Sequence, residues 1–216
     1  MTRTHWAAIA AVVLALLFAG AATVASAGDG DGSRTPASDS ADAGFARDMS
    51  LHHQQAVEMS FIIRDRTKNE EIRRLAYDIA NTQANQRGMM LGWLDLWGLP
   101  VTTAGSEPMA WMSQGGGDHS GHSGQQSAGE GSLMPGMATK AQLEKLGTLS
   151  GKAAEVEFLQ LMIVHHNGGV AMAEGCVRLC TVAPEKQLAQ GMVDAQRSEV
   201  ELMVDLLKGR GAQVRT

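Results

Sequence analysis

The chain has 216 residues and a formal net charge of −5 at pH 7. It contains no cluster of lysine and arginine of the kind that binds nucleic acid, so we expect no nucleic-acid partner. Its length suits a single domain with a proper hydrophobic core. Aromatic residues are few, with one Tyr and four each of Trp and Phe, so the core must be built from aliphatic residues and from the 13 methionines.

The N-terminus has the pattern of a secretory signal peptide over residues 1–27. Arg3 gives a short basic start, an apolar run follows from about Ala7 to Ala22, and a small-residue cleavage site ends at Ala27. Cleavage there predicts a secreted or extracytoplasmic protein with no membrane segment. The alternative is an uncleaved membrane anchor, since about 18 apolar residues can just span a bilayer. Residues 28–43 are small and polar and predict a disordered linker.

Apolar residues spaced three or four apart predict helices through the rest of the chain, and no alternating pattern indicates a strand. Capping boxes at Thr67–Glu70 and Thr139–Gln142 mark two helix starts. The predicted segments are a helix from Phe45, a second from Thr67 to the Gly98 and Pro100 stop signals, a Met/His/Gly-rich loop at about 99–138, a short helix at about 139–150, and longer helices at about 152–181 and 184–208.

The two halves of the chain resemble each other. Residues 45–98 align without a gap on residues 158–211, and about a dozen positions are identical. The matched positions include Phe45/Phe158, Met49/Met162, His52/His165, His53/His166, Val57/Val170, Met59/Met172, Leu75/Leu188, Gln83/Gln196, Met90/Met203 and Gly98/Gly211. A helical hairpin cannot bury its apolar stripe alone, so two copies predict an all-α, ferritin-like four-helix bundle over residues 44–211.

Each copy carries two adjacent histidines flanked by methionines, in "MSLHHQQAVEM" and "MIVHHNGGVAM". Thioether sulfur together with imidazole is a ligand set that suits Cu(I), whereas harder ions prefer carboxylates. The pattern predicts a metal site that prefers Cu(I), and eight candidate ligands: Met49, His52, His53, Met59, Met162, His165, His166 and Met172.

Polar residues on the second helix of each hairpin fall at the height of these motifs. Antiparallel pairing places Gln83 level with His52 and Gln86 level with Met49. In the second copy it places Gln196 level with His165 and Glu199 level with Met162. We expect these four side chains to orient the imidazoles from behind. The alternative is a metal-free core in which Gln83 and Gln196 bond to the histidines and the methionines fill gaps.

The stretches "FARDMSLHHQQAVEM" and "MPGMATKAQLEKLGTLSGKAAEVEFLQLMIVHHNGGVAMAEG…QRSEVELM" resemble the domain of unknown function 305 family. The resemblance covers about residues 44–208 and implies a ferritin-like helical bundle of an exported bacterial protein. Some members of that family are associated with copper, so the resemblance implies a metal role for the eight candidate ligands and implies no catalytic activity. The first copy has Gln54-Gln55-Ala56 after its histidines, where the second has Asn167-Gly168-Gly169.

Two other functions fit a helical bundle. A di-iron carboxylate oxidoreductase needs Glu-x-x-His pairs on facing helices, and no Glu-x-x-His occurs in the sequence. A partner-binding module without metal could use the Met- and Trp-rich ends of the bundle; no protein partner is indicated. We therefore expect a metal-binding protein that is not an enzyme.

Two further groups of residues remain open. The central loop adds candidate metal ligands, namely Met109, Met112, His119, His122, Met134 and Met137, although a plain flexible linker has a similar composition. Cys176 and Cys180 favour a disulfide in an exported protein. Their spacing is wide for a disulfide within a helix, so the bridge would need local unwinding near Thr181.

Overall fold

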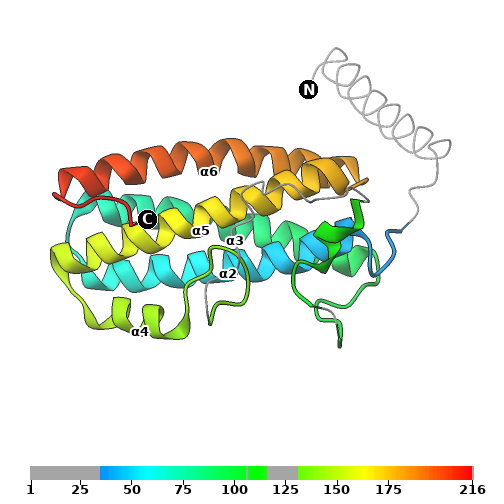
Figure 1. Ribbon diagram of the computed structural model, residues 1–216, viewed down its shortest axis with the longest axis horizontal. Coiled ribbons are helices and arrows are strands. Elements are labelled where there is room, and N and C mark those ends of the chain that lie inside the picture. The colour runs from blue at the N-terminus through cyan, green and yellow to red at the C-terminus, as the bar shows by residue number, and fades with distance from the viewer. Residues whose placement is uncertain (1–34, 106, 116–130, 216) are drawn as a thin grey trace, which may run out of the picture. The chain divides into compact units, whose positions relative to one another are not determined.

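The computed structural model describes residues 35–105, 107–115 and 131–215. Within these ranges the chain forms α-helices and one short 3-10 helix, with no strand, which confirms the predicted all-α helical bundle. The elements are α2 (Ala41–Arg66), α3 (Glu70–Leu96), η1 (Ala110–Gly115), α4 (Lys140–Thr148), α5 (Gly151–Leu179) and α6 (Ala183–Gly209) (Figure 1). None of these helices is long and apolar enough to cross a membrane. The expected signal peptide, residues 28–34 of the expected linker, and His119 and His122 lie outside the described ranges.

Two antiparallel hairpins make the bundle. Helix α2 packs along α3, α5 packs along α6, and the hairpins meet mainly where α2 contacts α5 (Figure 1). The short helix α4 lies against α2 and α5. Its predicted capping box is present, because the Thr139 hydroxyl accepts from Gln142 N–H while the Gln142 side chain accepts from Thr139 N–H.

The apolar core is divided into two clusters. One contains Met59 and Met162 and the other contains Met49 and Met172. On α2 the residues between the clusters are His52 and His53, and the equivalent stretches of α3, α5 and α6 also carry polar residues. Helices α2 and α5 therefore run antiparallel, with a polar layer across the middle of the bundle.

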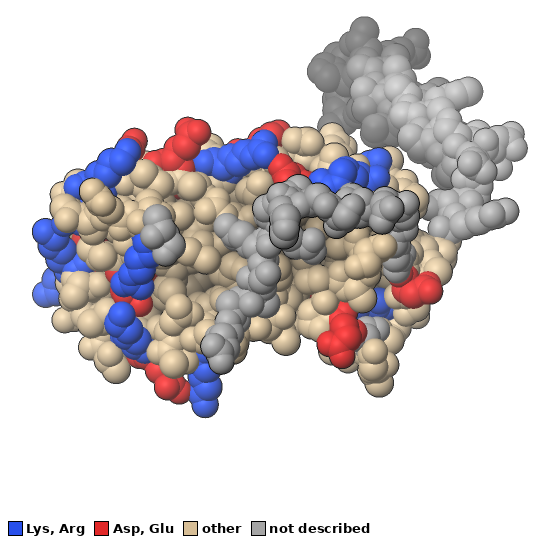
Figure 2. All heavy atoms as spheres, viewed as in Figure 1, with Lys and Arg blue, Asp and Glu red and all other residues tan. Residues whose placement is uncertain are grey.

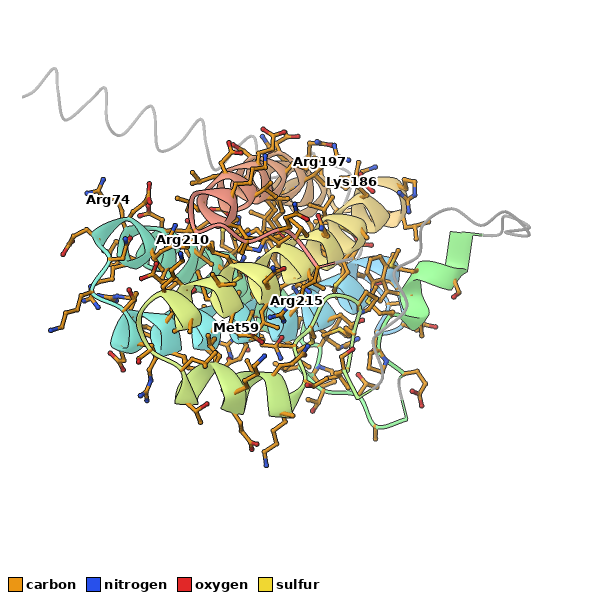
Figure 3. All side chains as sticks on the ribbon, turned by 60° about the vertical axis from the view of Figure 1, so that its left-hand side comes forward. Met59, Arg74, Lys186, Arg197, Arg210 and Arg215 are labelled. Carbon is orange, nitrogen blue, oxygen red and sulfur yellow. A yellow bond between two sulfur atoms is a disulfide. The ribbon has the colours of Figure 1, made fainter. Side chains whose placement is uncertain are left out.

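Most charged side chains lie on the outside of the bundle, although Asp42, Glu155, Glu157 and Glu185 are buried. Met59 is fully buried between the helices, whereas Arg74 and Arg197 point outward from α3 and α6 (Figure 3). On the face seen in Figure 2, basic and acidic side chains lie close to one another. Several pair directly, including Arg197 with Glu174 and Lys145 with Glu157.

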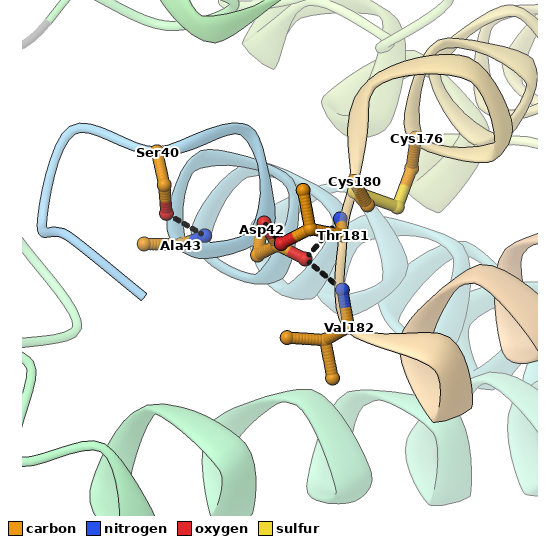
Figure 4. The surroundings of a disulfide bond; sticks show 7 residues. All are labelled: Ser40, Asp42, Ala43, Cys176, Cys180, Thr181 and Val182. Atoms are coloured by element: carbon orange, nitrogen blue, oxygen red, sulfur yellow. Dashed lines mark hydrogen bonds between the residues drawn. A yellow bond between two sulfur atoms is a disulfide. The ribbon is translucent and has the colours of Figure 1, made fainter. Parts of the chain in front are cut away.

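The first helix begins earlier than the sequence predicts. Ala41, Asp42 and Ala43 were expected in the linker, but they form the first turn of α2, with Ser40 as the N-cap. The Ser40 hydroxyl accepts from Ala43 N–H, and the Asp42 carboxylate accepts from the backbone N–H groups of Thr181 and Val182 (Figure 4). These contacts order the segment, and its polar composition alone gave no sign of them.

The predicted capping box at Thr67 is wrong. Thr67 is the C-cap of α2, and its hydroxyl donates to Glu155 of α5. Asn69 caps α3 instead, and its side chain accepts from Ile72 N–H. Because Glu155 holds the turn between α2 and α3, as Asp42 holds the turn between α5 and α6, each hairpin's first helix anchors the other hairpin's turn.

The central segment is anchored to the bundle at both ends. The Asp48 carboxylate accepts from Met109 N–H and from the Trp111 indole N–H, and the Trp111 side chain is buried. At the other end, the Gln55 side-chain amide both donates to and accepts from the backbone of Ala138. The described parts of the expected loop therefore pack on the helices, and one of these parts forms the short 3-10 helix η1.

A close approach between glycines sets the position of residues 134–138. A Cβ atom on Gly168 of α5 would lie 2.2 Å from the carbonyl oxygen of Pro135. A Cβ atom on Gly136, whose φ is +80°, would lie 2.6 Å from the Val164 carbonyl oxygen. Only glycine at both positions lets this segment rest directly on α5.

We predict that Gly168→Ala lowers the free energy of unfolding by about 1–3 kcal/mol, because the added methyl group forces the segment away from α5. Gly88→Ala on α3 is the matched control, since a Cβ there has no neighbour within 4 Å. The control should be stabilised by about 0.5–1 kcal/mol. Urea unfolding of both variants checks the pair, and equal effects would contradict the close approach.

Candidate metal centre

Four histidines occupy the polar layer at the centre of the bundle. His52 and His53 come from α2, and His165 and His166 come from α5. All four side chains are fully buried. The imidazoles of His52 and His165 lie against each other with their ring centres 3.8 Å apart and their planes tilted by 31°.

Each imidazole has a hydrogen-bond acceptor at Nε2. His53 faces Gln86 Oε1 at 2.9 Å, and His166 faces Glu199 Oε2 at 2.7 Å. His165 faces the backbone oxygen of His52 at 3.0 Å. His52 faces the backbone oxygen of Pro135 at 3.3 Å.

These acceptors fix the tautomers. A carbonyl or carboxylate oxygen can only accept, so Nε2 carries the proton in His52, His165 and His166, and the Gln86 oxygen favours the same form in His53. A neutral imidazole protonated at Nε2 has a free lone pair at Nδ1. The Nδ1 atoms of all four histidines are buried without a hydrogen-bond partner in the described structure. Four lone pairs in the middle of the core are therefore unused.

Burial keeps the imidazoles of His52, His53 and His165 neutral. Desolvation lowers the pKa of His52 to about 3, with the neighbouring His53 adding to the effect. Desolvation lowers the pKa of His53 to about 4, partly offset by the hydrogen bond to Gln86. The pKa of His165 also falls well below its usual value, through burial first and the adjacent His52 second. A neutral imidazole is the form that binds metals.

The polar residues behind the histidines differ in detail from the sequence prediction. Gln86 and Glu199 bond to His53 and His166, although they were expected at the height of Met49 and Met162. Gln83 and Gln196 are buried, and their side-chain amides have no hydrogen-bond partner in the described structure. The metal-free alternative had these two amides bonded to His52 and His165, and those bonds are absent from the described contacts.

The methionines of the two motifs lie on both sides of the layer. All four are fully buried, with Met49 and Met172 in one apolar cluster and Met59 and Met162 in the other. Met49 and Met59 are ten residues apart on one helix, which is about 15 Å along its axis. One ion cannot contact both, so the eight predicted ligands cannot form a single site.

The described methionines of the central segment reach the same end of the core. Met134 is buried in the cluster of Met49, and Met109, Met112 and Met137 pack against that cluster. These described methionines therefore pack on the core, which differs from a plain flexible linker.

Several contacts at the layer involve residues that sequence reasoning missed. Pro135 supplies the acceptor for His52, and Gln55 holds the segment that carries Pro135. The available signal was the difference between the two halves after the histidines, where one has Gln54-Gln55-Ala56 and the other Asn167-Gly168-Gly169. Gln55 bonds to the segment, and Gly168 has no side chain and lets the segment approach α5 closely. Farther along α5, Cys176 and Cys180 are joined by a disulfide, with Cys180 as the C-cap.

The histidines alone do not preform a metal site. In the described ranges, the one group of three His, Cys, Asp or Glu side chains close enough to share an ion is Cys176, Cys180 and Glu185. A metal in the histidine layer would therefore need thioether ligands as well as imidazole.

The fold and the layer define an antiparallel helical-bundle protein with a buried histidine and methionine centre. The chain belongs to the domain of unknown function (DUF305) family, whose sequence profile matches residues 42–207. The resemblance noted in the sequence is thereby confirmed. Among curated proteins none matches the chain.

Solved structures share the fold. A DUF305 protein of Streptomyces coelicolor, described as secreted, is 61% identical with a TM-score of 0.73, over 83% of this chain and 99% of that one. A DUF305 fragment from Deinococcus radiodurans is 30% identical with a TM-score of 0.60, over 78% and 95%. CopM in its Cu(I)-bound form is 21% identical with a TM-score of 0.57, over 78% and 96%, and at that identity the likeness shows the fold alone.

The buried neutral histidines predict that mild acid destabilises the metal-free protein. The folded pKa values of His52, His53 and His165 lie below the unfolded value of about 6.5, so the unfolded chain binds more protons and stability falls as pH drops below about 6.5. Each such histidine contributes up to about 1.4 kcal/mol per pH unit. Burial and the Asp42 charge raise the pKa of Glu185 to about 9. The folded chain therefore holds one proton on Glu185 that the unfolded chain has lost, and this partly offsets the loss of stability in acid.

Urea unfolding between pH 7.5 and 5 measures the slope. His53→Gln keeps an amide donor for Gln86 and removes one titrating group, so its slope should be smaller than that of the parent chain by about one proton. Identical slopes for the two proteins would show that His53 is not buried in its neutral form.

Proposed function

We propose that this protein binds Cu(I) outside the cytoplasm, through the histidine and methionine side chains at the centre of the bundle. The observation that carries the proposal is the set of four buried Nδ1 lone pairs without partners. A buried polar atom without a partner costs about 1–3 kcal/mol. A bound ion would use these lone pairs, and the Nε2–H bonds already hold the rings in the form that ligation needs.

The donor types favour Cu(I) over other ions. Neutral imidazole and thioether carry no charge, so a monovalent soft ion leaves the smallest charge in the core. Two thioethers and imidazole suit Cu(I), while Zn²⁺ would seek thiolate or carboxylate. CopM, which has the same fold, has been crystallised in Cu(I)-, Cu(II)- and Ag-bound forms.

We place two copper positions in the bundle. Met49 and Met172 would serve one side of the layer, and Met59 and Met162 the other, because each pair shares an apolar cluster. The histidines between the clusters serve both positions. Met134 lies in the first cluster, with Met137 packed against it, and these two are the described loop residues best placed to add a ligand there.

The proposal is capture without turnover. Thioether ligands favour the reduced ion and oppose cycling to Cu(II). A role in copper storage or resistance follows from capture, and export follows from the signal-peptide pattern at the N-terminus. The alternative is a partner-binding module in which the histidines serve packing alone; it predicts a stable protein with no affinity for Cu(I).

We predict that His53→Gln and His166→Gln together weaken Cu(I) binding by at least about tenfold. The glutamine amide can still donate to Gln86 and Glu199, so the fold is kept while the Nδ1 lone pairs are lost. Titration of the oxidised protein against a coloured Cu(I) chelator measures the affinity, and circular dichroism checks the fold. Unchanged binding after all four histidines become Gln in a folded protein would overturn the proposal.

The methionines test the two positions separately. Met→Leu conserves volume and costs less than about 1.5 kcal/mol in a core. We expect Met49→Leu with Met172→Leu to remove one Cu(I) equivalent, and Met59→Leu with Met162→Leu to remove the other. Met203→Leu, a buried methionine of α6 outside the motifs, should bind as the parent does. Loss of all binding from either pair alone would point to one shared position.

A further inference from the structure

A second group of side chains of types that can bind a metal lies at one end of the bundle, away from the histidines. The ligand atoms of Cys176, Cys180 and Glu185 all lie within 4.8 Å of one another, and all three residues are buried. Cys176 is ten residues beyond His166 on α5, which is about 15 Å along the helix. This group is therefore separate from the histidine layer.

Glu185 is a buried carboxyl that lies beside the two sulfur atoms. It is fully buried near the start of α6, and neither of its carboxyl oxygens has a hydrogen-bond partner in the described structure. An unpartnered buried carboxyl is costly, and such a group calls for a specific explanation. Burial first, and then the charge and the hydrogen-bonding contact of the neighbouring Asp42 side chain, raise the pKa of Glu185 to about 9, so the buried group is neutral and lies beside Asp42.

In the other half of the chain, two of the three matching positions are filled by apolar side chains. In the gap-free alignment, the residues that match Cys176, Cys180 and Glu185 are Ile63, Thr67 and Ile72. Ile63 and Ile72 are fully buried in the apolar cluster at the opposite end of the core. Packing alone is thus satisfied by two isoleucines, and the cysteine and glutamate set is an addition.

We propose that Cys176, Cys180 and Glu185 form a site for a zinc-class divalent cation that becomes available when the disulfide is reduced. The spacing of two cysteines with three residues between them falls in the range used by zinc sites. Two thiolates and a carboxylate are a Zn²⁺ donor set, whereas Cu(I) would use the thiolates alone and leave Glu185 out. While the S–S bond is present, neither sulfur carries the charge that a metal ligand needs.

The chemistry has two steps. A dithiol reductant gives two electrons and two protons to the Cys176–Cys180 bond, and its own sulfurs join in a disulfide. Zn²⁺ then displaces the protons of the two thiols and of the Glu185 carboxyl. Cys180 is the C-cap of α5 and adjoins the exposed Thr181, so the reductant approaches the disulfide from the solvent beside this residue.

Asp42 is the positioning residue of this site. Its carboxylate accepts from the backbone N–H groups of Thr181 and Val182 and from the Thr181 hydroxyl (Figure 4). These bonds hold the turn that joins Cys180 to Glu185, and they come from α2, a separate element. The turn can therefore keep its place after the disulfide opens.

The test uses the whole mature chain in two forms, oxidised and dithiol-reduced, with the reductant removed under argon. Co²⁺ replaces Zn²⁺ as the probe, because thiolate ligation gives it a charge-transfer absorption that histidine and methionine do not produce. We expect one Co²⁺ equivalent with this absorption in the reduced chain and none in the oxidised chain. Zn²⁺ should displace it.

Two variants separate the ligands from the fold. Glu185→Gln should keep the thiolate absorption and weaken Zn²⁺ binding at least about tenfold. Glu185→Ile, which restores the residue type of the aligned position in the first half, should do the same in a protein at least as stable as the parent. Equal affinity in parent and both variants would remove Glu185 from the site. No thiolate absorption in a folded, reduced chain would overturn the site itself, and neither result bears on Cu(I) binding by the oxidised protein.

Discussion

The cost of burying polar atoms at the middle of a helical bundle governs the rest of this structure. Four imidazoles and the amides of Gln83 and Gln196 interrupt the core and divide it into two apolar clusters. Each unpartnered atom there opposes folding by an amount that is large against a typical domain stability of about 5–15 kcal/mol. The fold must therefore supply stability elsewhere.

The hydrogen bonds of the histidine layer are nearly the same in the two halves of the bundle, with one exception. The His53–Gln86 and His166–Glu199 bonds span the same 33 residues in each half. The exception is the pair His52 and His165. His52 bonds to the backbone oxygen of Pro135 in the central segment, whereas His165 bonds to the backbone oxygen of His52. Gln55 on α2 holds that segment by hydrogen bonds, and Gly168 on α5 leaves space for it. The asymmetry places the carbonyl of Pro135, and with it Met134, beside one half of the layer.

Sequence reasoning reached the features that depend on periodicity within one element. The spacing from Phe45 to Ile63 gave α2, and the aligned motifs of the two halves placed the histidines on facing helices. It failed where a contact from a distant element decides the outcome. Thr67 had the form of an N-cap, but Glu155 takes its hydroxyl, and Asn69 caps the helix. Residues 41–43 had a linker's composition, but Asp42 fastens them to the turn after α5.

The same limit explains why Glu185 escaped notice. A glutamate after a proline in the first turn of a helix is ordinary, because a negative charge there favours the helix dipole. Nothing local says that this side chain turns inward toward two cysteines. The alignment of the halves could have shown it, since a buried isoleucine, Ile72, stands at the matching position. One half of this duplicated fold fills the position with an apolar side chain, so packing does not require a carboxyl there. The neighbouring sulfurs supply the chemical role that we propose for it.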